Sequence, residues 1–178
     1  MAQTTQQYIQ RILGHVEGRD AMQVQRGTAP KLKKLMQGLS PKELKWKPDP
    51  GKWSIAEIVA HLADTEIVAS WRMRSVLGAN GTPIQAFDQD SWASVFEYGK
   101  RDPKQSLELF RVLRDNNLAM LKALPPERWD NYGMHEERGK ETLSHLTRMF
   151  AGHDANHVLQ VESIAGQLKS ARKKKERK

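Results

Sequence analysis

The chain has 178 residues and a formal net charge of +8, a length that fits one domain. Seven of the last ten residues are basic, so residues 1–168 carry only +2, which argues against a nucleic-acid-binding surface spread over the body. The absence of cysteine excludes disulfides, iron–sulfur clusters and thiolate metal sites, and the longest hydrophobic run, four residues, is too short for a membrane span. The polar start, residues 1–7, lacks the apolar core of a secretory signal, so we expect a soluble cytoplasmic protein.

Helical periodicity and helix-capping signals predict helices, in chain order, at 5–24, 30–38, 54–77, 103–123 and 140–167. The strongest start signal is Ser54 followed by Glu57, a pair that can form a capping box, and Asp102 before Pro103 gives a second start. No segment shows the sustained two-residue alternation of a half-buried strand. The predicted fold class is therefore all-α.

The four long predicted helices each carry an apolar stripe and need one shared core. A four-helix bundle is the simplest way to bury these stripes. The long connection over residues 77–102 predicts one crossover between the second and third helices of the bundle. We expect a single bundle domain over residues 1–168, and a basic, disordered tail over residues 169–178.

Two histidines four residues apart in the last predicted helix suggest a metal site. His153 and His157 would lie on one helix face about 5–6 Å apart at Cβ, close enough for both to bind one ion. They interrupt an apolar row that includes Phe150 and Val161, so both imidazoles need polar partners, and a metal ion would satisfy both at once. The alternative is a pair of half-exposed histidines bonded to water or to neighbouring side chains.

A third ligand should come from a facing helix, because metal sites in bundles draw on several helices. His61 is a candidate beside the apolar stripe of the helix at 54–77, although a histidine there can also be purely structural. His15, His135 and His145 rank lower: the first suits a surface position, the second lies in a glycine-bounded loop that could overhang the site, and the third is rotated off the face of His153.

The segment 153–157, His-Asp-Ala-Asn-His, is similar to the zinc-peptidase pattern HExxH with Asp154 in place of glutamate. No histidine follows His157, so the downstream ligand of such peptidases is missing. We therefore disfavour a peptidase and interpret Asp154 as an acid near the site or at the surface.

Four segments together carry a resemblance to a known family. They are residues 50–66, with Pro-Gly-Lys-Trp-Ser-Ile-Ala-Glu-Ile leading to His-Leu-Ala-Asp-Thr-Glu, and residues 87–93, 132–139 and 151–160. With them the chain resembles the DinB-like superfamily and, within it, the YfiT-like group of metal-dependent hydrolases and thiol S-transferases. The resemblance covers about residues 5–167.

This resemblance implies a four-helix bundle, a homodimer, and one divalent ion held by His61, His153 and His157. The ion is nickel or zinc in typical members, with manganese and iron as alternatives. Members with assigned activity join low-molecular-weight thiols such as bacillithiol to electrophiles, and relatives of the fold isomerise maleylpyruvate with mycothiol. The implied partners are thus a small thiol and an electrophilic or acyl substrate.

Three classes of function follow from these observations. The favoured one is an enzyme in which the ion activates a thiol, as an S-transferase, or water, as a hydrolase. The second is a non-catalytic metal-binding bundle that acts as a dimeric interaction or stress-response module. The third, nucleic-acid or membrane-surface binding through the basic tail, is disfavoured because short basic runs bind weakly and non-specifically.

The sequence assigns no catalytic acid or base. Several further side chains are candidates to lie near the ion or to line a pocket beside it: Glu66, Asp154, Trp53, Trp92 and His135, with Tyr98, Arg72 and Arg74 as additional ones.

Overall fold

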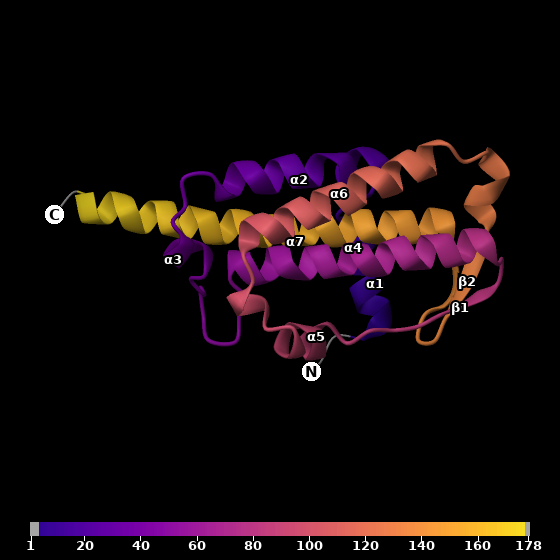
Figure 1. Ribbon diagram of the computed structural model, residues 1–178, viewed down its shortest axis with the longest axis horizontal. Coiled ribbons are helices and arrows are strands. Elements are labelled where there is room, and N and C mark those ends of the chain that lie inside the picture. Colours follow the sequence, from indigo (N-terminus) through magenta and orange to yellow (C-terminus); the bar gives the residue numbers. More distant parts are fainter. Residues whose placement is uncertain (1–3, 177–178) are drawn as a thin grey trace.

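Four long helices lie side by side in the computed structural model, which describes residues 4–176 (Figure 1). They are α2 (Ala21–Met36), α4 (Ile55–Gly78), α6 (Pro103–Lys122) and α7 (Leu143–Glu176). The α2 and α4 helices each pack against both α6 and α7. This arrangement confirms the predicted four-helix bundle.

The connection between α4 and α6 runs back along the length of the bundle, so that these neighbouring helices point in the same direction (Figure 1). It contains a short helix, α5 (Gln89–Val95), and a 3-10 turn, η1 (Tyr98–Lys100). The predicted helix starts on either side are confirmed: Ser54 and Glu57 form a capping box at α4, and Asp102 caps α6. The predicted crossover between the second and third bundle helices is therefore present.

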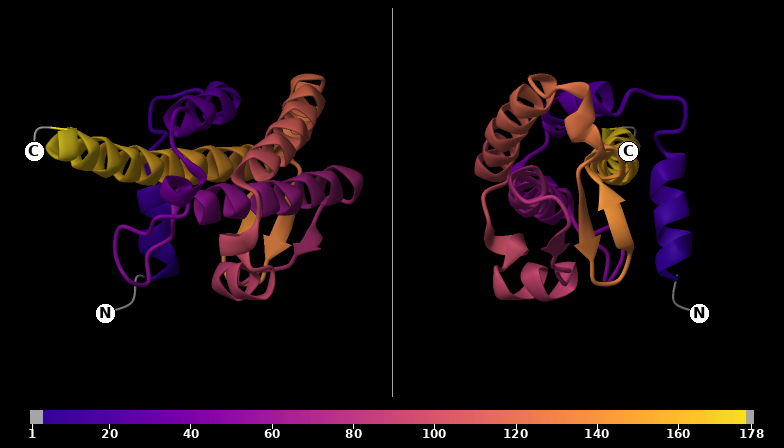
Figure 2. Two further views of the ribbon diagram at one scale, coloured as in Figure 1. Left: turned by 60° about the vertical axis from the view of Figure 1, so that its left-hand side comes forward. Right: turned by 90° about the vertical axis from the view of Figure 1, so that its right-hand side faces the viewer.

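The N-terminal region differs from the prediction of one helix at 5–24 and another at 30–38. The chain forms α1 (Thr5–Gly14), turns through Gly18 with φ +67°, and starts α2 after Asp20, whose side chain accepts a hydrogen bond from the backbone N–H of Gln23. Pro30 lies inside α2 rather than at a helix start. The helix α1 is separate from the bundle and crosses α7 on the outside (Figure 2).

A small sheet, absent from the prediction, lies at one end of the bundle beneath α4 and α7 (Figure 2). Its strands are β1 (Thr82–Ile84), β2 (Tyr132–His135) and β3 (Gly139–Thr142); β2 pairs in parallel with β1 and antiparallel with β3. Strands of three or four residues are too short to show an alternating pattern. The remaining short elements are α3 (Pro41–Leu44) and the 3-10 helix η2 (Pro126–Asp130).

The basic segment at the C-terminus also differs from the expected disorder. The α7 helix continues through residues 169–176 and projects past the rest of the bundle (Figure 1), while residues 177–178 lie outside the described part of the chain. Lysine and arginine favour helices, and Arg172 bonds to the carboxylate of Glu43 and the carbonyl oxygen of Gly38. None of the described helices is long and apolar enough to cross a membrane.

The core of the bundle consists of two apolar clusters with a polar layer between them. One cluster contains apolar residues from 55–63 of α4 and from 158–168 of α7. The other contains apolar residues from 69–76 of α4 and from 143–150 of α7. Between them, both helices bury polar side chains at the same level, including Glu66 on α4 and Asp154 on α7. The candidate site lies in this layer.

Gly152 is expected to be required for the packing of α1 against α7. A Cβ atom at this position would lie 2.1 Å from the carbonyl oxygen of Ile12, a backbone atom that cannot move without displacing α1. Gly152→Ala should therefore lower the free energy of unfolding by about 1–3 kcal/mol. Gly166 in the same helix is the matched control, because a Cβ atom there would meet no atom within 4 Å beyond its chain neighbours and the nearby helix backbone. Gly166→Ala should raise the free energy of unfolding by about 0.5–1 kcal/mol. Equal effects of the two substitutions in urea unfolding would contradict this packing.

Candidate metal centre

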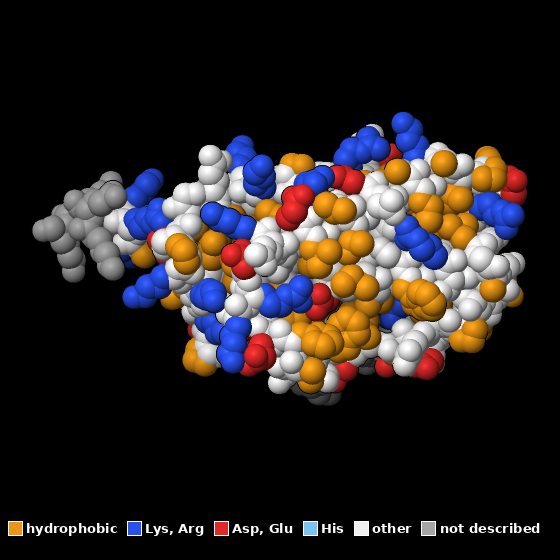
Figure 3. All heavy atoms as spheres, viewed as in Figure 1, with side chains coloured by type: hydrophobic (Ala, Val, Ile, Leu, Met, Phe, Trp, Pro, Cys, Tyr) orange, Lys and Arg blue, Asp and Glu red, His pale blue; other side chains and the backbone are white. Residues whose placement is uncertain are grey.

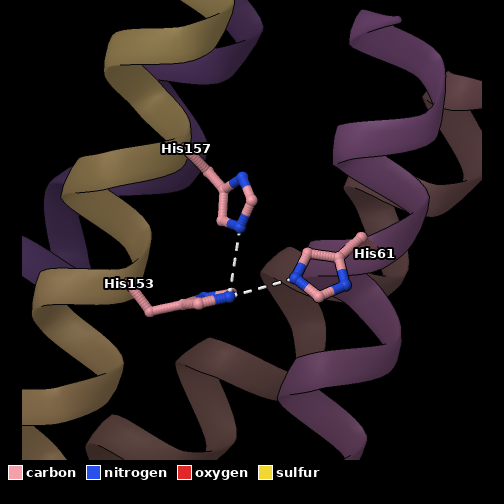
Figure 4. A group of neighbouring side chains, drawn as sticks. All are labelled: His61, His153 and His157. Carbon is pink, nitrogen blue, oxygen red and sulfur yellow. Dashed lines mark hydrogen bonds between the residues drawn. The ribbon is translucent and has the colours of Figure 1, made fainter. Parts of the chain in front are cut away.

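Three histidines from two helices converge between α4 and α7 (Figure 4). His61 projects from α4, and His153 and His157 project from successive turns of α7. The Nε2 atom of His153 lies 3.0 Å from Nε2 of His61 and 3.1 Å from Nε2 of His157. All three side chains are buried. The structure therefore brings together the three residues that the sequence singled out.

The geometry fits a divalent ion bound through the three Nε2 atoms. Two nitrogens bound to one ion at about 2.0–2.1 Å lie roughly 2.8–3.4 Å apart for angles between a right angle and the tetrahedral value, which matches the two spacings from His153 Nε2. The His157 Nδ1 atom lies 3.0 Å from the amide oxygen of Gln160. Because that oxygen only accepts, Nδ1 carries the proton and Nε2 offers its lone pair toward the other two rings.

Without an ion, the same cluster has a hydrogen-bonding deficit. The three Nε2 atoms face one another, and a single N–H on His153 can be shared but cannot fully serve both neighbours. A cation bound by the three Nε2 atoms would relieve this deficit. The Nδ1 atoms of His61 and His153, which would not touch such an ion, are buried and have no hydrogen-bond partner among the residues that the structure describes.

Burial keeps all three imidazoles neutral. It holds the pKa of His61 and His153 well below the usual value, with the neighbouring imidazoles adding to the effect. For His157 burial lowers the pKa to about 4, partly opposed by the hydrogen bond to Gln160. Neutral imidazole is the form that binds metal, so the site is ready for an ion at neutral pH.

These lowered pKa values predict that the metal-free protein loses stability in mild acid. A histidine in the unfolded chain has a pKa of about 6.5, so from there downward the unfolded state takes up protons that the native state refuses. The free energy of unfolding should then fall by up to about 1.4 kcal/mol per pH unit for each imidazole. Urea unfolding at several pH values from about 7.5 to 5 measures this slope, after chelation of metal. A flat profile, or stability that rises toward acid, would contradict it.

An aromatic wall and a polar groove adjoin the three histidines. The Trp53 ring lies 4.9 Å from His61 and stacks at 6.4 Å on His157, and Tyr98 lies 6.3 Å from Trp53 on the other side. A groove of about 490 Å³ reaches His157 and Trp53 and is lined further by polar residues of α5 and α7, among them Gln89, Asp90, Gln160, Ser163 and Gln167. It gives a small molecule a route to one edge of the cluster.

The buried side chain of Arg114, which the sequence did not single out, forms hydrogen bonds to three other helices next to this site. Arg114 on α6 donates hydrogen bonds to Glu66 on α4, at 2.7 Å, to Asp154 on α7, and to the carbonyl oxygen of Gln25 on α2, at 3.1 Å. Glu66 and Asp154, two of the candidates to lie near the ion, both pair with this guanidinium. The signal was available, since Arg114 interrupts the apolar row between Phe110 and Leu118 as the histidines interrupt theirs.

The other candidate residues lie apart from the cluster. Trp92 packs on Phe87 with ring centroids 5.0 Å apart in a different pocket, and His135 lies on β2, where its Nδ1 accepts the backbone N–H of Glu137. Arg74 donates to side chains of α6 and does not line that pocket, whereas Arg72 does. Within the described residues, His61, His153 and His157 are the only group of three or more that could share an ion.

A helical bundle with a crossover after its second helix and a histidine cluster between two helices defines a known class of protein. The DinB superfamily model matches residues 26–161, and the chain belongs to this superfamily. The structure is similar to the solved structure of YfiT from Bacillus subtilis, with a TM-score of 0.78 and 20% sequence identity, covering 94% of this chain and 90% of that one. That protein is described as having an unusual four-helix bundle topology.

The relatives with similar sequences carry the provisional name of metal-dependent hydrolase. YfiT of Bacillus subtilis is 23% identical over 140 residues, 78% of each chain, and a protein of Geobacillus kaustophilus is 26% identical over 140 residues, 78% of this chain and 79% of that one. A protein of Oceanobacillus iheyensis is 24% identical over 114 residues, 64% of this chain and 66% of its own length.

Proposed function

We propose that the protein is a metal-dependent enzyme of the YfiT type in which His61, His153 and His157 hold one divalent ion, nickel or zinc. The observation that carries the proposal is the convergence of three buried Nε2 atoms, with His153 at 3.0 and 3.1 Å from the other two. When bound by three neutral imidazoles, such an ion keeps its full double charge and lowers the pKa of a thiol or water molecule that it holds.

The residues of the chain would contribute orientation and exclusion of solvent. Gln160 fixes the tautomer and the ring orientation of His157, the kind of support that metal-binding histidines require. Trp53 packs its ring beside His61 and His157 and would shield them in part from bulk water. The polar groove beside them would admit a small, hydrogen-bonding substrate.

The reaction would be transfer of a low-molecular-weight thiol to an electrophile, or hydrolysis of an acyl substrate. The names of the relatives favour hydrolysis for those proteins, and the resemblance noted from the sequence also includes thiol transfer. The alternative, a non-catalytic metal-binding module, would share the ion but have no turnover. A homodimer, implied by the same resemblance, is a further proposal that light scattering in solution tests.

The discriminating experiment measures turnover with and without the ion. Loss of a bacillithiol-type thiol in the presence of monochlorobimane, and hydrolysis of a panel of small esters and amides, are followed for metal-loaded and chelator-treated protein. A metal-dependent rate in either assay, lost in His61→Ala and retained in His145→Ala, supports the enzyme. No turnover above the uncatalysed rate in either assay, combined with a stoichiometric ion, would favour the non-catalytic module.

A further inference from the structure

A second pocket lies beside α4, away from the three histidines. It has a volume of about 430 Å³ and is formed by one face of α4 and the segment that leads from β1 to α5. Trp71, Arg72 and Ser75 line it on the helix side, and Gln85, Phe87 and Trp92 line it on the other. Figure 3 shows hydrophobic side chains gathered over the α5 region on this face of the molecule. The pocket is thus mostly apolar and rich in aromatic rings.

Arg72 is a buried charge in this apolar setting. The residue is only 6% exposed, and within the described part of the chain its guanidinium makes one hydrogen bond, from Nη2 to the carbonyl oxygen of Gln85. The same group lies 5.8 Å from the ring of Phe87. No carboxylate in the described part of the chain forms an ion pair with it. A buried arginine has five N–H donors and is strongly destabilising unless an anion or acceptors satisfy it.

The acidic groups in the neighbourhood are committed to other partners. Glu141 accepts two hydrogen bonds from Arg138, at 2.8 and 3.0 Å, and the Asp88 carboxylate accepts the backbone N–H groups of Asp90 and Ser91 at the start of α5. Arg138 adds a second positive charge near Arg72, which Glu141 offsets, and the Glu136 carboxylate accepts the backbone N–H of Ala86 at 3.4 Å. Burial, followed by repulsion from Arg138, lowers the pKa of Arg72 to about 10, with Glu141 opposing. At neutral pH the guanidinium remains charged, and none of the carboxylates in residues 4–176 forms an ion pair with it.

We propose that this pocket binds a small organic anion whose carboxylate or phosphate group pairs with Arg72 and whose apolar body packs against Trp71, Phe87 and Trp92. The planar guanidinium fork suits either oxyanion, and the aromatic walls suit a flat hydrocarbon group. Arg72 follows His61 by eleven residues on α4, about 16 Å along the helix axis. The site is therefore distinct from the metal centre, and it can be tested whether or not the protein binds a metal.

Calorimetric titration with three naphthalene probes tests the site on the full chain. We expect 1-naphthoate or 1-naphthyl phosphate to bind, and the neutral 1-naphthamide to bind at least about tenfold more weakly, because only the anions pair with the guanidinium. The stronger of the two anions identifies the oxyanion that the site prefers. Binding of the amide as tight as that of the anions, or no binding of either anion at millimolar concentration, would overturn the proposal.

Three substitutions, one of them a control, locate the binding. Arg72→Gln should weaken the binding of the preferred anion at least about tenfold. Arg74, two residues along the same helix, bonds to Asn116 and Asn117, and Arg74→Gln should leave the affinity for the anion unchanged. Ser75→Trp fills the pocket while keeping the arginine and should also abolish binding, which keeps the test valid if Arg72→Gln fails to fold. Unchanged affinity in a folded Arg72→Gln or Ser75→Trp protein would contradict the site.

Discussion

His153→Ala is expected to lower the affinity of the protein for nickel or zinc by at least about a hundredfold. The Nε2 atom of His153 lies within 3.1 Å of both other ligand nitrogens, so it is the central member of the cluster. Substitution of a residue that only supports a metal ligand lowers the affinity for the metal by about 10–100-fold. Loss of a ligand itself should lower the affinity at least as much. Untagged protein is purified, and bound metal is quantified by mass spectrometry before and after dialysis against a competing chelator.

His145→Ala is the matched control, because His145 lies on the same helix but is half-exposed and faces Glu141 rather than the cluster. It should retain one ion per chain. His61→Ala and His157→Ala should behave like His153→Ala. If all three variants hold as much metal as the wild-type protein, the three imidazoles are not the ligands.

Arg114→Met is expected to lower the free energy of unfolding by about 3–5 kcal/mol, the largest stability loss that we predict for a single substitution. Both carboxylates that Arg114 pairs with, Glu66 and Asp154, are almost fully buried. Removing the guanidinium leaves two like charges in the core, and within residues 4–176 the side chains of Thr28 and Asn117 are the donors that remain to them. Urea unfolding of the two proteins at neutral pH measures the difference.

The exposed Arg111 on the same helix provides the comparison, since it also bonds to two carboxylates, Glu108 and Asp115. Arg111→Met should leave stability almost unchanged, because exposed ion pairs are screened by water. Combining Arg114→Met with Glu66→Gln and Asp154→Asn should recover part of the loss, because the buried charges are then gone. Equal stability of the Arg111→Met and Arg114→Met proteins would contradict the prediction, because it would show that burial does not determine how much these ion pairs contribute to stability.

The site was predictable to the extent that residues interrupt an apolar helical row. The four-residue spacing of His153 and His157 and their position between Phe150 and Val161 point to a shared partner without further information. His61 lies 92 residues before His153. Helix periodicity alone does not decide whether this histidine is a metal ligand or a structural residue. Its assignment depended on the family resemblance, because only the packing of α4 against α7 brings the rings together.

The parts of the fold that were not predicted depend on tertiary contacts rather than on local pattern. Each strand of the sheet is held by its pairing with another segment far away along the chain, as β1 is with β2. Pro30 occurs within α2, where packing of that helix against α7 and α6 outweighs the local preference of proline for a helix start. Residues 169–176 continue α7 although Ala171 is the one apolar residue in that stretch of sequence, and Arg172 forms an ion pair with Glu43.

The most direct test of a shared ion is anomalous diffraction from crystals grown with the metal that the untagged protein retains. We expect one anomalous peak about 2.0–2.1 Å from Nε2 of each of His61, His153 and His157, at the absorption edge of that metal. No peak between these three rings at full metal loading, or a peak bound by other side chains, would contradict it.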